Sequence, residues 1–196
     1  MRYAIVTDLN RCIGCLSCSV ACKMENNIPI GSFNIKVDRI GPTPKQEGSR
    51  FPDVEMYFLP LMCQHCEEPQ CVLVCPSEAL YKAADGAVLL DSEKCDGCEA
   101  CIDACPYGLV YFNPRENVAG KCDLCHHRVV RGQVPACVSQ CVGRALAFGD
   151  LDDPDSPVSA MIADAGKNVY SLSDSGSNPT FRYILRNATW RGIASD

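Results

Sequence analysis

The chain has 196 residues, which is room for one compact core or two small ones. Sixteen residues of its 47% hydrophobic fraction are cysteines, so the ordinary apolar interior is smaller than that fraction suggests. The net charge is −6 and no basic stripe is present, which argues against a nucleic-acid partner because phosphate binding needs clustered Lys and Arg.

No apolar run approaches the roughly 18 residues that indicate a transmembrane helix, so no direct membrane span is predicted. The N-terminus shows neither a long apolar segment nor a twin-arginine pair, so we expect no export signal on the chain itself. Any contact with a membrane is therefore expected to come through a partner.

The predicted elements are short strands that alternate with four groups of cysteines. Strands are predicted over residues 3–7, 54–59, 79–81, 87–90, 109–112 and 145–148. Residues 31–59 contain several Pro and Gly and are predicted to cross the surface as an excursion. Short strands separated by cysteine-bearing loops predict a loop-rich α+β fold.

All sixteen cysteines fall into the four groups. The groups are Cys12, Cys15, Cys18 and Cys22; Cys63, Cys66, Cys71 and Cys75; Cys95, Cys98, Cys101 and Cys105; and Cys122, Cys125, Cys137 and Cys141. The first and third have the spacing C-x2-C-x2-C-x3-C of bacterial ferredoxins, in which three thiolates hold one [4Fe-4S] cluster and the fourth reaches another. The pattern therefore predicts iron-sulfur clusters.

Two other readings of the cysteines are weaker. A disulfide scaffold is typical of short secreted chains with dispersed cysteines, whereas these are tightly grouped. A structural zinc site needs only two separated C-x2-C pairs, so the last two cysteines of each group would be surplus. Zinc stays an alternative that metal analysis can decide.

An internal repeat supports the ferredoxin interpretation. A shift of 83 residues lays the first group on the third and also matches Asp8 with Asp91 and Gly14 with Gly97. Each copy begins with a short apolar run that leads into the cysteine loop. The sequence thus predicts two ferredoxin-like units related by duplication, each binding two clusters.

The residues after the last cysteines suggest how the groups pair. Pro76 and Pro106 follow groups two and three, whereas Lys23 and Val142 follow groups one and four. We therefore predict one unit from residues 1–30 plus 118–150, and an inserted unit from residues 60–117. With exchange of the fourth ligand, the predicted ligand sets are Cys12, Cys15, Cys18 and Cys141; Cys122, Cys125, Cys137 and Cys22; Cys63, Cys66, Cys71 and Cys105; and Cys95, Cys98, Cys101 and Cys75.

Several motifs around these cysteines resemble one protein family. They are Cys12-Ile13-Gly14-Cys15, Cys22-Lys23-Met24-Glu25-Asn26, residues 63–71 through Cys75-Pro76, Cys105-Pro106-Tyr107-Gly108, Lys121-Cys122-Asp123-Leu124-Cys125, Val134-Pro135-Ala136-Cys137, and Phe148-Gly149-Asp150-Leu151 with Asp153-Pro154 and Ser156. Over residues 3–185 the chain resembles the four-cluster electron-transfer subunits of molybdopterin oxidoreductases that reduce dimethyl sulfoxide, polysulfide, thiosulfate, tetrathionate or arsenate. Val142 departs from that pattern, since relatives often have Pro there, which bears on the local turn more than on cluster binding.

The resemblance implies a non-catalytic subunit with four [4Fe-4S] clusters. It would relay single electrons between a large molybdopterin catalytic subunit and an integral-membrane quinone-reactive subunit, as in anaerobic respiration. It would lie peripheral to the cytoplasmic membrane, on the periplasmic face if co-exported with a signal-bearing catalytic subunit and otherwise in the cytoplasm. The alternative is the beta subunit of a formate dehydrogenase or hydrogenase, although formate dehydrogenase relatives often end in a membrane helix.

Charged residues beside the ligands complete the candidate site. Lys23 and Lys121 each adjoin a ligand, and an ammonium near an anionic cluster would raise its reduction potential. His65, His126 and His127 lie within or beside the ligand loops, where we expect supporting or surface roles. No catalytic constellation or phosphate loop is present, so we expect no substrate site on this chain.

Residues 151–196 contain no cysteine and form the predicted C-terminal tail. The segment is rich in Ser and Gly near residues 171–177 and is too polar there to fold alone. Asp152, Asp153 and Asp155 are expected in a solvated loop or a helix N-terminus. We expect the tail to wrap a large partner subunit.

Overall fold

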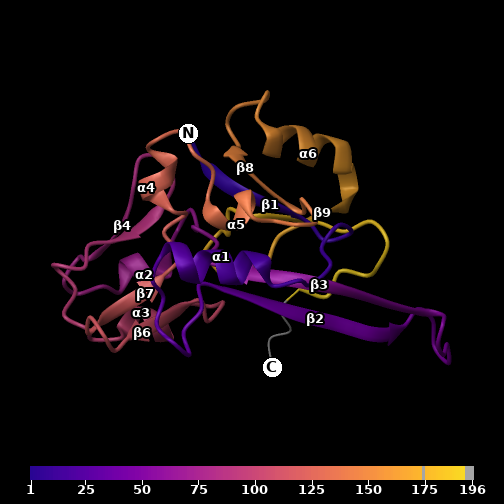
Figure 1. Cartoon of the computed structure of the whole chain (residues 1–196), viewed down its shortest axis with the longest axis horizontal. Coiled ribbons are helices and arrows are strands. Elements are labelled where there is room, and N and C mark those ends of the chain that lie inside the picture. The colour runs from indigo at the N-terminus through magenta and orange to yellow at the C-terminus, as the bar shows by residue number, and fades with distance from the viewer. Residues whose placement is uncertain (174, 193–196) are drawn as a thin grey trace.

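The computed structural model describes residues 1–173 and 175–192, and it mixes short helices and strands with many loops (Figure 1). This agrees with the predicted α+β class. Within the described residues, no helix combines the length and apolar character needed to cross a membrane.

A four-stranded sheet joins strands from the N-terminal and C-terminal parts of the sequence. Its order is β8 (Leu146–Asp150), β1 (Tyr3–Asp8), β10 (Arg182–Ile184) and β9 (Val169–Tyr170). β1 pairs antiparallel with β8 and parallel with β10. Residues 4–8 of this inner strand are buried, because one face packs against α6 and the other against the cysteine-bearing segments.

Two small hairpins carry the middle of the chain. β4 (Leu80–Lys82) pairs with β5 (Val88–Leu90), and β6 (Val110–Asn113) pairs with β7 (Val118–Lys121). The four-residue helices α2 (Gln70–Leu73) and α3 (Ala100–Asp103) pack beside them. The strands predicted around residues 79–81, 87–90 and 109–112 are therefore confirmed within one residue at each end, whereas β7 was not predicted.

The excursion of residues 31–59 forms most of a long hairpin that projects to the right in Figure 1. Its strands are β2 (Ile35–Pro44) and β3 (Val54–Met62), and β3 confirms and extends the strand predicted over 54–59. β2 was missed because it contains Pro42 and Pro44. The pairing register shifts between Ile40 and Thr43, an irregularity of the kind at which a strand accommodates proline.

The described part of the C-terminal tail packs on the chain itself. α6 (Pro157–Ala165) begins at the N-cap Ser156 and covers β1 and β8, and the 3-10 turn Gly166–Asn168 leads to β9. Phe181, Tyr183 and Leu185 are fully buried in this chain's core. Asp152, Asp153 and Asp155 lie just before α6, as predicted from the sequence. The tail also contributes β10 to the main sheet. Wrapping of a partner stays a prediction, and residues 174 and 193–196 of the tail lie outside the described residues.

Two remaining helices connect the cysteines of group four. α4 (His126–Val129) follows Cys125 directly, and α5 (Ala136–Ser139) contains Cys137. α5 packs against α1 (Ser17–Glu25), which carries Cys18 and Cys22. This contact brings groups one and four together although more than 100 residues separate them in the sequence.

Candidate metal centres

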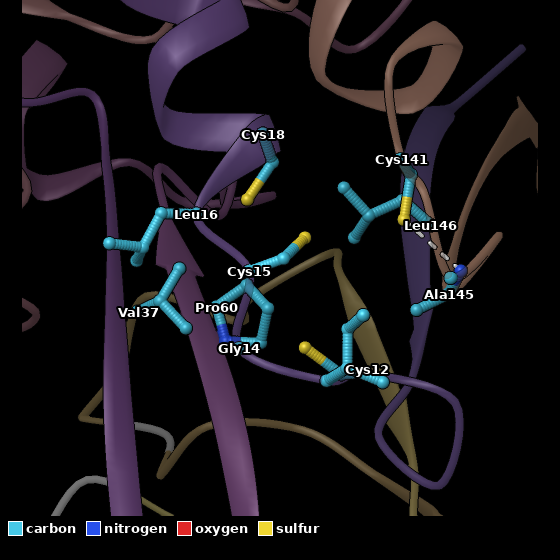
Figure 2. Close-up of a pocket in the computed structure, with 12 residues that line it drawn as sticks. Cys12, Gly14, Cys15, Leu16, Cys18, Val37, Pro60, Cys141, Ala145 and Leu146 are labelled. Atoms are coloured by element: carbon cyan, nitrogen blue, oxygen red, sulfur yellow. Dashed lines mark hydrogen bonds between the residues drawn. The ribbon is translucent and has the colours of Figure 1, made fainter.

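Four cysteine thiols from two distant segments line one apolar cavity. Cys12 and Cys15 lie in the loop after β1, Cys18 lies in the first turn of α1, and Cys141 follows α5. Figure 2 shows their sulfur atoms around a common space. The cavity holds about 360 Å³ of empty space, part of it open to solvent. Its other lining residues are Ile13, Gly14, Leu16, Val37, Pro60, Gly143, Ala145 and Leu146.

A second cavity of similar size is built from groups two and three. It is lined by Cys63, Cys66, Cys71 and Cys105. The pKa of the Cys66 thiol is raised to about 12, mainly by burial and then by the nearby Cys63, Cys71 and Cys105 thiols. The surrounding side chains are largely apolar, including Val88 of β5, so the four thiols share a mainly apolar space.

The third collection of thiols is the most buried. Burial raises the pKa values of Cys122 and Cys137 well above the ordinary value, and in both cases the nearby Cys22 thiol adds to the effect. The side-chain amide of Asn26 donates to Cys22 Sγ at 3.4 Å and to Cys125 Sγ at 3.8 Å. Cys22 is thereby placed with Cys122, Cys125 and Cys137 rather than with the rest of its own group.

The fourth collection lies around α3. The pKa of Cys101 is raised to about 11, mainly by burial and in part by the nearby Cys75, Cys95 and Cys98 thiols. Cys98 is exposed, as is Cys15 in the first collection. Cys75 therefore lies near the thiols of group three, and the assignment of these four cysteines to one cluster stays a prediction.

The loops of groups one and three have matching backbones. Gly14 and Gly97 have φ near +70°, and the helix N-caps Leu16 and Glu99 are left-handed at φ 63° and 62°. Asp8 and Asp91 each accept a hydrogen bond from the backbone N–H two residues later. Such detailed correspondence is what a duplication would leave.

The missing proline after Cys141 does not change the turn. In group four, Arg144 donates from its backbone N–H to Cys141 O, and Glu78 and Gly108 make the same bond to Cys75 and Cys105. All three residues have positive φ, between 47° and 59°. Val142 therefore keeps the geometry that proline accompanies in groups two and three.

The donor set fits a group that prefers sulfur. All sixteen cysteines are free thiols, and neutral thiols are favoured in these apolar cavities unless a cation compensates the thiolate charge. Soft thiolates are the ligands of iron-sulfur clusters. In addition, Val88 N–H donates to Nδ1 of the fully buried His65, so Nε2 carries the proton, yet Nε2 has no partner among residues 1–173 and 175–192. A buried N–H of this kind indicates a group outside the polypeptide.

The two candidate lysines have different surroundings. Lys23 donates to Pro29 O and Ser32 O and lies 4.4 Å from the centre of the Phe33 ring. Lys121 is buried and donates to Val88 O and Cys122 O. Its ammonium also lowers the pKa of Cys71, although burial and the neighbouring thiols leave that pKa raised to about 12 overall. A tuning role for either lysine stays a prediction.

The other polar residues near the thiols are partly new. His126 Nε2 lies 3.1 Å from a carboxylate oxygen of Asp85, and His127 Nε2 lies 2.9 Å from one of Glu25, so both histidines contact carboxylates near the surface. Sequence reasoning assigned no role to Asn26, although its position four residues after Cys22 in a helix places the two side chains on one face. Asn34, a second amide beside Cys22, lies in the loop before β2 and carries no comparable signal.

Comparisons with known proteins agree with this chemistry. Residues 54–151 match one family model described as a 4Fe-4S dicluster domain, and residues 11–79 match another with the same description. Two dicluster matches and sixteen cysteines imply four [4Fe-4S] clusters.

Named relatives cover nearly the whole chain. It is 40% identical to a tetrathionate reductase subunit of Salmonella typhimurium, over 93% of this chain and 72% of the relative. It is 42% identical to a putative dimethyl sulfoxide reductase iron-sulfur subunit of Halobacterium salinarum, over 93% and 79%. It is 41% identical to the thiosulfate reductase electron transfer subunit PhsB of Salmonella typhi, over 98% and 97%. The chain therefore belongs to the family of [4Fe-4S] electron-transfer subunits of the molybdopterin oxidoreductases.

Proposed function

We propose that the four thiol collections hold one cluster each and form a linear series. The order is Cys95, Cys98, Cys101 and Cys75; then Cys63, Cys66, Cys71 and Cys105; then Cys122, Cys125, Cys137 and Cys22; then Cys12, Cys15, Cys18 and Cys141. The observation that carries this proposal is the grouping of four thiols, from two cysteine groups each time, in the cavities and buried sites described above.

Electrostatic influences between thiols of neighbouring sets support the order. Burial is the main cause of the raised pKa values of Cys71, Cys122 and Cys137. A thiol of the neighbouring set adds to each. It is Cys101 for Cys71, Cys63 for Cys122 and Cys18 for Cys137. Each of these pairs joins one set to the next. The first and last sets contain the exposed thiols Cys98 and Cys15, so the ends of the series are the places where electrons enter and leave.

The polypeptide's contribution is to hold, insulate and bias the sets. When bound, each [4Fe-4S] cluster takes up and releases one electron. Apolar residues such as Val88, Val37 and Leu146 exclude water from the cavities. Backbone N–H groups donate to ligand sulfur, from Leu109 to Cys105 at 3.5 Å and from Ala145 to Cys141 at 3.2 Å. Such bonds stabilise negative charge on the sulfurs.

We infer that the partners are a molybdopterin catalytic subunit and a quinone-reactive membrane subunit. The support is that the relatives are named as subunits of reductase complexes for tetrathionate, dimethyl sulfoxide and thiosulfate. These names do not favour the formate dehydrogenase or hydrogenase alternative. A location peripheral to the cytoplasmic membrane follows from that assembly.

An anaerobic native purification of the tagged full chain tests this function. We expect a large co-purifying subunit that contains a pterin, and an electron paramagnetic resonance (EPR) titration that resolves four [4Fe-4S] clusters. Ligand sets are tested by changing Cys125 or Cys98 to Ser, each of which should alter a different one of the four signals. Zinc in place of iron, or reduction of a substrate by the isolated chain, would overturn the proposal.

A further inference from the structure

The last cysteines of groups two, three and four receive hydrogen bonds from the backbone a few residues later. Leu109 N–H donates to Cys105 Sγ and Ala145 N–H to Cys141 Sγ, in both cases from four residues on. Cys75 receives backbone hydrogen bonds from Leu80, Ala79 and Ser77, and its sulfur lies 3.7 Å from the Ser77 hydroxyl. Three of the four groups thus supply a main-chain donor to this sulfur.

Group one cannot use the same donor. α1 continues past Cys22 to Glu25, so the backbone N–H of Asn26 is directed to Cys22 O at 3.0 Å. The Asn26 side chain takes its place, because its amide donates to Cys22 Sγ at 3.4 Å and also reaches Cys125 Sγ at 3.8 Å. One side-chain amide therefore contacts two thiols of the same proposed set.

A second amide strengthens the local effect. The Asn34 side chain, as well as the Asn26 amide, hydrogen-bonds to Cys22. Asn34 is itself buried, at 4% exposure. This is the most buried of the four sets, and burial without such donors disfavours added negative charge.

We propose that Asn26 is a positioning residue that raises the reduction potential of the cluster held by Cys22, Cys122, Cys125 and Cys137. Adding one electron increases the negative charge on the sulfurs, and the amide N–H stabilises that charge more in the reduced state than in the oxidised one. The inference rests on the proposed ligand set. It assigns to a side chain the task that the backbone performs in the other three groups.

The test is an EPR-monitored potentiometric titration of the iron-loaded chain in its native complex. Asn26→Leu keeps the approximate size of the side chain and removes its donors. We expect the midpoint potential of one cluster to fall by about 59 mV, which is a tenfold change in a one-electron equilibrium. The other three potentials should stay unchanged, and the affected signal should be the one altered by Cys125→Ser.

Two further variants separate the hydrogen bond from charge and from folding. Asn26→Asp keeps the shape, has no N–H donor and adds a negative charge, so it should lower the same potential more. The matched control Asn27→Asp adds that charge one residue away at an exposed position without contact to sulfur, and it should shift the potential much less. Asn26→Gln keeps an amide and should partly restore the wild-type value.

The outcomes distinguish this inference from the ligand assignment. If wild-type protein does not show four [4Fe-4S] signals, the proposed function fails. If it shows four and neither Asn26→Leu nor Asn26→Asp lowers a single potential, only the role of Asn26 is overturned. Equal shifts in Asn26→Asp and Asn27→Asp would also overturn it, because charge alone would then explain the change. Loss of iron in Asn26→Gln as well as Asn26→Leu would indicate a structural role and count against the proposal.

Discussion

Groups one and three share their cysteine spacing and their loop backbone, yet their helices differ in length. α1 covers nine residues, from Ser17 to Glu25, whereas α3 covers four, from Ala100 to Asp103. Pro106 follows the last cysteine of group three, and a proline both lacks an N–H donor and disfavours helix at the preceding residue. Lys23 occupies the corresponding place in group one and allows the helix to continue.

The difference in helix length changes what the two groups can do. After α3 the chain turns back at once into β6, and the short hairpin β6–β7 packs beside the thiols. After α1 the chain leaves for the long β2–β3 hairpin, whose residues Val37 and Pro60 line the Cys12 cavity. The same cysteine spacing therefore occurs in two environments, and we expect Pro106, which stands where group one has Lys23, to be the reason that α3 ends earlier.

Removing the iron is expected to have the largest effect. It should remove the structural difference between groups one and three, because both lose the cations that hold their thiolates together. Anaerobic chelation under reducing conditions should eliminate the near-ultraviolet circular dichroism signal of both units and the cooperative unfolding transition. A reduced, iron-free chain that kept its native signal would contradict this expectation.

Proline at position 23 should make group one resemble group three at a cost in stability. Lys23→Pro removes a helix hydrogen bond inside α1, and we expect a loss of about 3 kcal/mol or more in thermal unfolding of the iron-loaded protein. Lys23→Ala removes only the ammonium and its contacts to Pro29 and Ser32, so it should cost less.

Val142→Pro provides the matched control. The turn after Cys141 already has the geometry found before Gly108 and Glu78, so we expect this variant to unfold within about 1 kcal/mol of wild type. A cost as large as that of Lys23→Pro would show that the helix in α1 is not the cause of the difference.

Alanine at Gly14 and at Gly97 should have different costs in stability, because the two matching glycines have different neighbours. A Cβ at Gly97 would lie 2.8 Å from the backbone oxygen of Asn117, whereas one at Gly14 would meet the Phe58 ring, which is a side chain and can shift. Both positions have positive φ, which costs roughly 1–2 kcal/mol for alanine. We expect Gly97→Ala to cost about 1 kcal/mol more than Gly14→Ala, and equal unfolding midpoints would contradict this reading.

The smallest expected effect concerns α6, which covers the sheet of groups one and four and has no counterpart beside groups two and three within the described residues. The Ser156 hydroxyl accepts from Ser159 N–H at 3.3 Å and donates to Asp150 O at 2.6 Å. Ser156→Ala should cost about 1 kcal/mol in the unfolding midpoint and leave the EPR signals unchanged. Ser159→Ala keeps the N–H and serves as control.

Local patterns predicted most of the cysteine-bearing parts. The strands before and after the groups were predicted to within a few residues, since short apolar runs beside Gly and Asp are strong local signals. The exchange of last cysteines between groups was inferred from spacing and from Pro76 and Pro106, and the ligand sets stay a prediction. In the structure, Cys22 of group one and Cys125 of group four lie beside the same amide, that of Asn26.

The parts that were missed depend on distant partners. β10 has only three residues and is placed by pairing with β1. The paired residues Val6 and Arg182 are 176 positions apart in the sequence. β2 contains prolines that a local reading treats as breaks. Whether the Lys23 ammonium faces a sulfur or the carbonyls of Pro29 and Ser32 depends on the path of a loop, which no residue pattern specifies.

The sequence by itself determined the chemistry of this protein: sixteen thiols in four groups specify a soft-metal ligand set, and the motifs around them carry the resemblance to the family. Only the tertiary structure decided which amide reaches Cys22, which side chains line each cavity and where the C-terminal strand lies. The reason is physical. Ligand identity is a property of single residues, whereas hydrogen-bond partners and burial are properties of segments that meet only when the chain has folded.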